Sequence, residues 1–347
     1  MKKQALLLIQ ALTFLLPLTS CMSPPTDQDV HTPQTIKEFF QKPQDPRRFG
    51  LTVYQSKYGP IFSGSKRLHD FQTAKSDFEG RNAYIPVVEV KGQKLEVVDA
   101  LLDTGSRDSW LTLDAAYLLA AQPLGPPPYR RLADHVGETE PGIAIYITKL
   151  RIGEIHVENM IAYVRIPQIT LGPLARKADD PKPEVVLGCD LLRTFSFVRF
   201  DYPNHCVYLS ADRKYEGSQD FLLESVPYER VNGTLAVKAL IDGEPVQAII
   251  DTGGDYEIAW NKPDETVIRQ LFIGELALLD VHITNAETLQ LGYPEIPRIG
   301  ARLLRKFAVT IDNKQRRIVF ERPVESGLFH REKKESTKPE PSTWVPN

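Results

Sequence analysis

Short runs of apolar residues that turn at a glycine recur in the middle of the chain. Residues 85–103 read I-P-V-V-E-V-K-G-Q-K-L-E-V-V-D-A-L-L-D, and residues 235–251 read L-A-V-K-A-L-I-D-G-E-P-V-Q-A-I-I-D. On each side of the glycine, apolar residues dominate and polar ones interrupt them, which is typical of two strands joined by a tight turn. The pattern therefore predicts two β-hairpins, each ending on an aspartate that threonine and glycine follow.

Two further blocks follow each D-T-G loop in the same order. The first pair is I-T-K-L-R-I-G-E at 147–154 and I-R-Q-L-F-I-G-E at 268–275. The second pair is V-L-G-C-D-L-L-R-T-F at 186–195 and R-I-G-A-R-L-L-R-K-F at 298–307. Three matched blocks in one order indicate a duplicated β unit. The second copy is shorter, because it lacks a predicted short helix at 113–121 and the stretch at 133–142.

The paired D-T-G loops and their later glycines resemble the aspartic proteases of the pepsin and retropepsin group. In that family each lobe supplies one D-T-G loop and a later apolar-apolar-glycine segment that packs against it. The resemblance covers roughly residues 85 to 322. It implies an all-β, bilobed acid-protease fold of two related β-barrel-like lobes, with the active site between them.

By this resemblance Asp103 and Asp251 are the catalytic pair. Two carboxylates held about 3 Å apart cannot both ionise, so they share one proton. One then acts as general base on a water molecule, and the other polarises the scissile carbonyl. The reaction needs no metal and no cofactor. The resemblance also implies residues that support the dyad: Thr104, Gly105, Ser106, Thr252, Gly253, Gly254, Gly188 and Gly300.

Ser106 and Gly254 make the two loops unequal. In the family the residue after D-T-G can donate a hydroxyl hydrogen bond to its carboxylate, which favours the charged form. Ser106 can do this for Asp103, whereas Gly254 has no hydroxyl to donate. We therefore expect Asp251 to carry the shared proton, and Gly254→Ser to move the acid limb of the pH profile down.

One flap is expected to cover the substrate. The stretch at 133–142 falls where the family's flap hairpin folds, and its candidate residues are His135, Val136, Gly137 and Glu138. Because the second copy lacks this stretch, the chain should carry a single flap and complete its active site as a monomer.

The first twenty residues predict export. A short positive start precedes an apolar run that is too short to span a membrane as a mature helix, and L-T-S-C at 18–21 ends it with small residues. This end resembles the lipobox of bacterial lipoproteins, which implies lipidation of Cys21 and a place in the bacterial cell envelope. An uncleaved anchor helix and an ordinary signal remain alternatives.

Composition suggests the remaining boundaries. After a signal peptide at 1–20, we expect a tether at 21–80, whose structure beyond residue 35 we leave open. An N-terminal lobe with the flap follows at 81–215, then a shortened C-terminal lobe at 222–322 and a disordered tail at 323–347. The folded part should lie between about Asn82 and Arg322.

Charge and cysteine content narrow the function. A net charge of −3 offers no basic surface for nucleic acid. Cys189 and Cys206 are either bridged, which an oxidising envelope permits, or two buried free thiols. We expect an aspartic endopeptidase that cleaves peptides or proteins. The alternative is a catalytically inactive envelope lipoprotein that binds peptide or cell-wall ligands in the same cleft.

Overall fold

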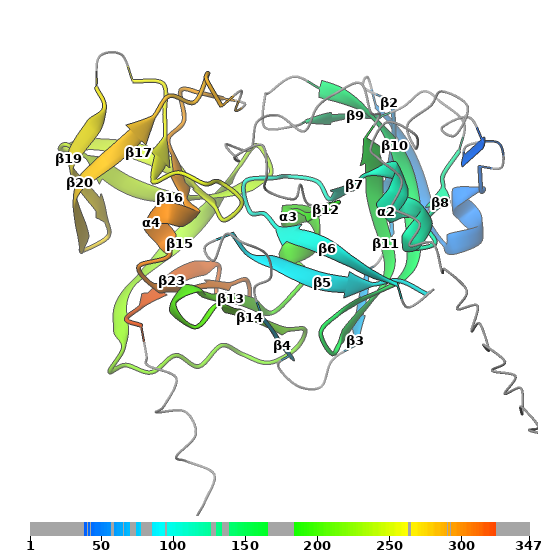
Figure 1. The fold of residues 1–347 in the computed structure, drawn as a ribbon, viewed down its shortest axis with the longest axis horizontal. Helices are drawn as coiled ribbons and strands as arrows, with labels where there is room; N and C mark the ends of the chain where they lie inside the picture. The colour runs from blue at the N-terminus through cyan, green and yellow to red at the C-terminus, as the bar shows by residue number, and fades with distance from the viewer. Residues whose placement is uncertain are drawn as a thin grey trace, which may run out of the picture.

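The computed structural model describes the chain from residue 38 to residue 323, with gaps. The described residues are 38–39, 41, 43–56, 59–64, 66–69, 74–77, 85–93, 96–125, 130–133, 139–165, 184–262, 265–289, 291 and 293–323. Strands make up most of this part and helices are few and short, so the predicted all-β, two-lobed fold is confirmed. Figure 1 shows one lobe in cyan and green and the other in yellow and orange, with a shared sheet below them.

Six strands close into a barrel in the first lobe. In hydrogen-bonded order they are β11 (Ile155–Arg165), β7 (Trp110–Leu111), β12 (Val185–Leu187), β6 (Val97–Leu102), β5 (Val87–Lys91) and β10 (Thr139–Ile152). The pairing of β10 with β11 completes the ring. Two shorter strands, β8 (Gln122–Pro123) and β9 (Arg130–Ala133), pair with β10 outside it. Helix α2 (Leu113–Leu118) begins after Thr112, whose side chain caps it, at the place where the sequence predicts a short helix.

The second lobe repeats this arrangement without α2. Its ring consists of β16 (Thr234–Ile241), β17 (Glu244–Asp251), β21 (Arg298–Gly300), β18 (Ile258–Ala259), β20 (Leu276–Thr284) and β19 (Val267–Ile273). The directions of pairing also agree. In each lobe the strand that leads into D-T-G runs parallel to the strand that ends on the later glycine: β6 beside β12, and β17 beside β21.

A sheet shared by the two lobes continues from the second barrel, because β15 (Leu222–Val231) also pairs with β16. Its strands, in order, are β15, β23 (Arg317–Glu321), β22 (Ala308–Asp312), β13 (Phe197–Asp201), β14 (Cys206–Ser210) and β4 (Ala74–Asp77). We expected residues 81–215 to form one lobe, but β13 pairs with β22 along its whole length. Every residue of β22 is buried, so this sheet is core to both halves of the molecule.

The folded part begins well before Asn82, which corrects the predicted boundary. After η1 (Pro46–Phe49), strands β1 (Thr52–Ser56) and β2 (Gly59–Ser63) form a hairpin. Strand β3 (Arg67–His69) then pairs with β11, and β4 pairs with β14. These strands are too short for an alternating pattern to show in the sequence, and the open edges of β11 and β14 provide their hydrogen-bond partners.

Residues 1–37 and 324–347 lie outside the described part, and with them the predicted signal peptide, Cys21 and nearly all of the tail. Among the described helices, none is long and apolar enough to cross a membrane.

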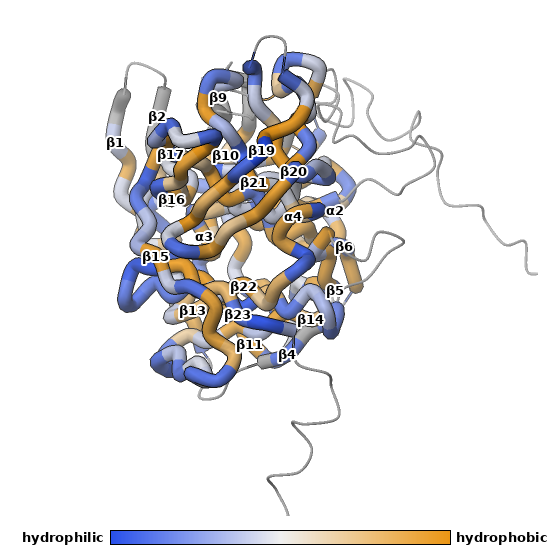
Figure 2. The backbone as a smooth tube through the Cα atoms, turned by 90° about the vertical axis from the view of Figure 1, so that its left-hand side faces the viewer, coloured by the Kyte–Doolittle hydropathy of each residue, from blue (hydrophilic) through white to orange (hydrophobic). Residues whose placement is uncertain are grey.

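The hydrophobic core runs continuously through both barrels and the shared sheet. In Figure 2 the hydrophobic segments mainly follow the strands, and hydrophilic residues gather at the turns between them. Apolar strand residues of both lobes are thus buried in one common core. The burial of this apolar surface holds the two halves together.

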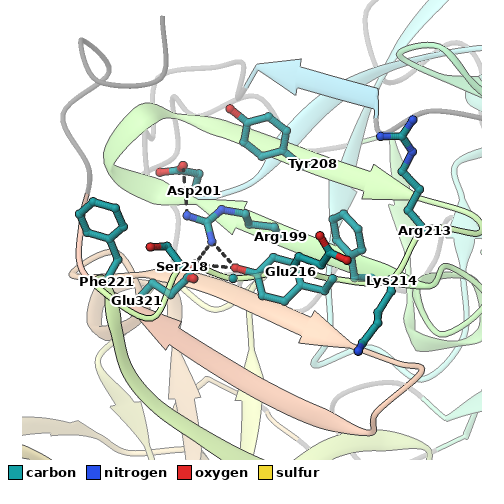
Figure 3. A pocket seen from close by; sticks show the side chains of 12 residues that line it. Arg199, Asp201, Tyr208, Arg213, Lys214, Glu216, Ser218, Phe221 and Glu321 are labelled. Carbon is teal, nitrogen blue, oxygen red and sulfur yellow. Dashed lines mark hydrogen bonds and ion pairs between the residues drawn. The ribbon is translucent and has the colours of Figure 1, made fainter. Parts of the chain in front are cut away.

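A buried ionic network ties the connection between the lobes to the shared sheet (Figure 3). Arg199 of β13 pairs with the carboxylate of Glu321 on β23, and it also donates to the hydroxyl of Tyr215 at 2.7 Å. That hydroxyl donates to Glu321 at 2.6 Å, and Asp201 lies 3.7 Å from the guanidinium. The four residues line one side of a cavity of about 780 Å³. Because Tyr215 belongs to the segment between β14 and β15, the network fixes that connection.

Replacing Arg199 by Met should destabilise the protein by about 3–5 kcal/mol, because Glu321 would keep a buried charge without its partner. The free energy of unfolding can be measured by chemical denaturation. Arg151→Met is the control: it removes an exposed pair with Glu154, so a change of under about 1 kcal/mol is expected. Equal effects of the two variants would contradict a structural role for the network.

Candidate active site

The two D-T-G loops meet at the seam between the lobes, where their threonines hold each other. The amide of Thr104 donates to the hydroxyl of Thr252 at 3.1 Å, and the amide of Thr252 donates to the hydroxyl of Thr104 at the same distance. Each hydroxyl then donates across the seam, to Ile250 O at 2.6 Å and to Leu102 O at 2.7 Å. Both threonines are fully buried. This reciprocal set of bonds locks one loop against the other, as the resemblance implies.

The glycines of the loops make room for the opposite carboxyl group. A Cβ atom on Gly253 would lie 2.5 Å from Cγ of Asp103, and one on Gly105 would overlap the carboxyl of Asp251. Any side chain there would push the carboxyls apart. The close approach of Asp103 and Asp251 therefore depends on glycine at both positions.

The later glycines lie directly behind the loops. Gly188 follows β12, where a Cβ atom would come within 2.6 Å of Asp108 O. Gly300 ends β21, paired in register with Asp251. Helices α3 (Cys189–Leu192) and α4 (Ala301–Leu304) start at these glycines, and their first amides donate to the loop carbonyls, Cys189 N to Ser106 O and Ala301 N to Gly254 O, each at 2.8 Å. Both loops are thus supported in the same way.

Asp103 receives backbone donors. The amides of Gly105 and Ser106 donate to its Oδ1 at 2.7 and 3.2 Å. The hydroxyl of Ser106 instead donates to Asp108 O at 2.9 Å. The expected hydroxyl bond from Ser106 to Asp103 is therefore wrong, because the loop aims the Ser106 amide at the carboxylate and turns its side chain away.

Asp251 has two side-chain donors that the sequence analysis missed. The hydroxyl of Tyr256 donates to its Oδ2, and Nη1 of Arg298 lies 3.5 Å from the same atom. Arg298 also donates to Gly105 O at 3.3 Å, so it touches both loops. One signal was available: Arg298 stands where the first copy has Val186, and a charge is unexpected in an apolar-apolar-glycine segment.

Burial raises the pKa of Asp103 to about 7, and the negative charge of Asp251 beside it adds to the rise. The Gly105 amide and the charge of Arg298 oppose this effect on the pKa but do not cancel it. The interaction of the two carboxyl side chains with each other also raises the pKa of Asp103. These effects favour the protonated form of Asp103, whereas the sequence analysis expected Asp251 to carry the shared proton.

The geometry around Gly254 changes the expected effect of Gly254→Ser. A Cβ atom on Gly254 would lie 2.6 Å from Cε1 and from the hydroxyl of Tyr256. A serine there would displace the tyrosine from Asp251 rather than add a donor. The position beside the carboxylate is already occupied.

Cys189 and Cys206 are free and buried, so they form no disulfide. Cys189 lies at the start of α3 and donates from Sγ to Thr104 O at 3.1 Å, whereas Cys206 starts β14 in the shared sheet. Burial raises the pKa of the Cys189 thiol, which keeps it protonated and unreactive.

The flap candidates His135, Val136, Gly137 and Glu138 lie outside the described residues. The strands on either side of them, β9 and β10, pair antiparallel from Ala133 opposite Thr139 onward.

With both loops in place, the comparison with known families becomes informative. Residues 87–191 match the family model of aspartyl proteases. The matched stretch runs from β5 into α3 and holds Asp103, its D-T-G loop and Gly188. No curated protein matches the chain. The match thus supports an aspartyl protease family for the first lobe, and the structure brings the second D-T-G loop to the same seam.

The raised pKa of Asp103 predicts that stability falls as pH rises. The folded state holds a proton there up to about pH 7, whereas an ordinary aspartic acid releases it near 3.8. The stabilising contribution is complete below the lower value and is lost as pH passes the higher one, by at most about 4 kcal/mol. Asp103→Asn removes the titrating group, so denaturation of both proteins across this range should show a shallower fall for the variant. Parallel pH curves for the two proteins would contradict the assigned pKa.

Proposed function

We propose that the protein is an aspartic endopeptidase, which hydrolyses peptide bonds through a water molecule activated by Asp103 and Asp251. The observation that carries the proposal is the contact between two buried carboxyl groups, each at the end of an equivalent strand. Burying such a pair costs free energy that stability alone does not require. An arrangement of this kind is typical of acid–base catalysis.

The geometry supports the following reaction steps. Ionised Asp251 takes a proton from the water, whose oxygen adds to the carbonyl carbon, while Asp103 gives its proton to the carbonyl oxygen. The resulting gem-diol then breaks its C–N bond. The leaving nitrogen takes a proton from Asp251, and a hydroxyl of the gem-diol returns a proton to Asp103, which restores the starting state.

Asp103→Asn and Asp251→Asn should each lower kcat/KM by at least about a hundredfold, because the proposed reaction needs both carboxyl groups. Turnover can be followed on a mixed peptide library, with and without pepstatin. Asp99→Asn is the matched control, because Asp99 lies exposed on β6, the strand that leads into Asp103, and the variant should keep full activity. A wild-type protein that binds peptides but cleaves none would favour the inactive, ligand-binding alternative.

We also propose that the protein is anchored to the bacterial cell envelope by a lipid on Cys21, with peptides or proteins as substrates. The support comes from the sequence: a positive start, a short apolar run and a small-residue segment that ends on cysteine. The tether that follows would hold the two lobes away from the membrane surface.

Cys21→Ser should release the protein from membranes and leave its peptidase activity unchanged, because the lipid would be the only anchor. Fractionation of membrane and soluble protein measures the first effect, and the peptide assay measures the second. Equal membrane retention of variant and wild type would indicate an uncleaved helix or a peripheral contact instead.

A further inference from the structure

Tyr256 fills a space that two glycines leave open beside Asp251. Its side chain is buried, and a Cβ atom on Gly300 would lie 2.5 Å from its Cδ2. A Cβ atom on Gly254 would meet the other edge of the ring at Cε1. The ring therefore sits between these glycines and cannot swing away, which holds its hydroxyl on Oδ2 of Asp251.

Arg298 reaches the same oxygen from β21. Its residue is only 3% exposed, so its charge needs a compensating anion nearby. Asp251 is the carboxylate within 3.5 Å that its Nη1 contacts. A buried guanidinium and a phenol hydroxyl together favour negative charge on this carboxyl.

The first loop has neither donor. The residues that correspond to Tyr256 and Arg298 are Asp108 and Val186, and Asp103 is contacted by neutral backbone amides. The carboxylate of Asp108 pairs with Arg107 at 2.8 Å. The two loops share one backbone design, but their side chains present different electrostatic surroundings to the two carboxyls.

We propose that Tyr256 and Arg298 are positioning residues that assign different roles to the two carboxyls: they keep Asp251 ionised as the base, so that Asp103 carries the proton. This inference rests on the proposed function and adds to it the direction of proton transfer. It also explains why Gly254 and Gly300 are glycines, since a side chain at either position would move Tyr256.

Several other titratable groups lie around the carboxyl of Asp251 and interact with its charge. Asp103, Arg298 and Tyr256 face it directly, and its charge also raises the pKa of the buried hydroxyl of Tyr202 and of the Cys189 thiol. Burial is the main cause of the high pKa at both Tyr202 and Cys189, so these groups stay neutral over the range in which the dyad titrates. The first deprotonation of the dyad is therefore set by the carboxyls and their donors.

The decisive variant is Tyr256→Phe, which removes the hydroxyl and keeps the ring between the glycines. Without this donor the ionised form is less favoured, so the first deprotonation of the dyad should move up by about one pH unit. Carboxyl NMR titration of protein labelled at aspartate measures the shift, and Asp103→Asn and Asp251→Asn assign the signals. Arg298→Gln should move the titration in the same direction, because it removes a positive charge.

Tyr228→Phe is the matched control. This buried tyrosine donates to Asn313 Oδ1 at 2.9 Å rather than to a carboxyl of the dyad, so its loss should affect stability without moving the titration. In the peptide assay Tyr256→Phe should lower kcat about tenfold and leave KM within about twofold, because only the charged base is affected. The acid limb of its pH–rate profile should move to higher pH. Tyr228→Phe should leave the pH–rate profile unchanged.

An unmoved titration in Tyr256→Phe would overturn the assignment, whether or not the protein cleaves peptides. An equal shift in Tyr228→Phe would overturn it too, because the effect would then be a general loss of packing. The titration requires no turnover. Failure of the wild type to cleave any peptide would therefore count against the proposed function alone.

Discussion

Two carboxyl groups cannot be buried in contact with each other unless one of them keeps a proton, because the repulsion of two desolvated charges is too large. Much of this structure serves to hold Asp103 and Asp251 in that position. Glycines 105 and 253 remove the side chains that would separate them, and the threonines that precede those glycines bind the opposite loop. Each lobe is thus incomplete without the other at the point where the chemistry is proposed.

The seam needs a rigid frame, because the reciprocal threonine bonds are short and tolerate little movement between lobes. The shared sheet provides that frame. It takes β13 and β14 from the part of the chain that follows the first barrel, and β15, β22 and β23 from the part that holds the second. The buried pair of Arg199 and Glu321 then joins strands from both halves and holds the connection between the lobes through Tyr215. Strand β4 extends the same sheet from a segment that precedes both barrels.

Within this symmetric frame the dyad is asymmetric. The backbone of the two loops, the glycines behind them and the helices that cap them correspond in both lobes. The side chains around the carboxyls differ, because Tyr256 and Arg298 occupy places that hold Asp108 and Val186 in the first lobe. A carboxyl that meets a guanidinium and a phenol hydroxyl is stabilised as an anion, while its partner, buried and beside that anion, keeps its proton. The duplicated fold brings the pair together, and a few unmatched residues distinguish its members.

Some features of this protein follow from its sequence alone. Repeated hairpins, paired D-T-G loops and later glycines are local patterns, and they sufficed to predict the all-β, two-lobed fold and the positions of Asp103 and Asp251. The strands before residue 82 were missed, because each is too short to carry a periodic signal, and β3 and β4 are stabilised by the open edges of distant strands. Local patterns also could not show that Tyr256 and Arg298 donate to Asp251. Which hydroxyl reaches a carboxylate depends on the space between Gly254 and Gly300, and on a loop that turns Ser106 away from Asp103. Only the tertiary structure could decide this, because contacts across packed elements are set by distances in space rather than by spacing along the chain.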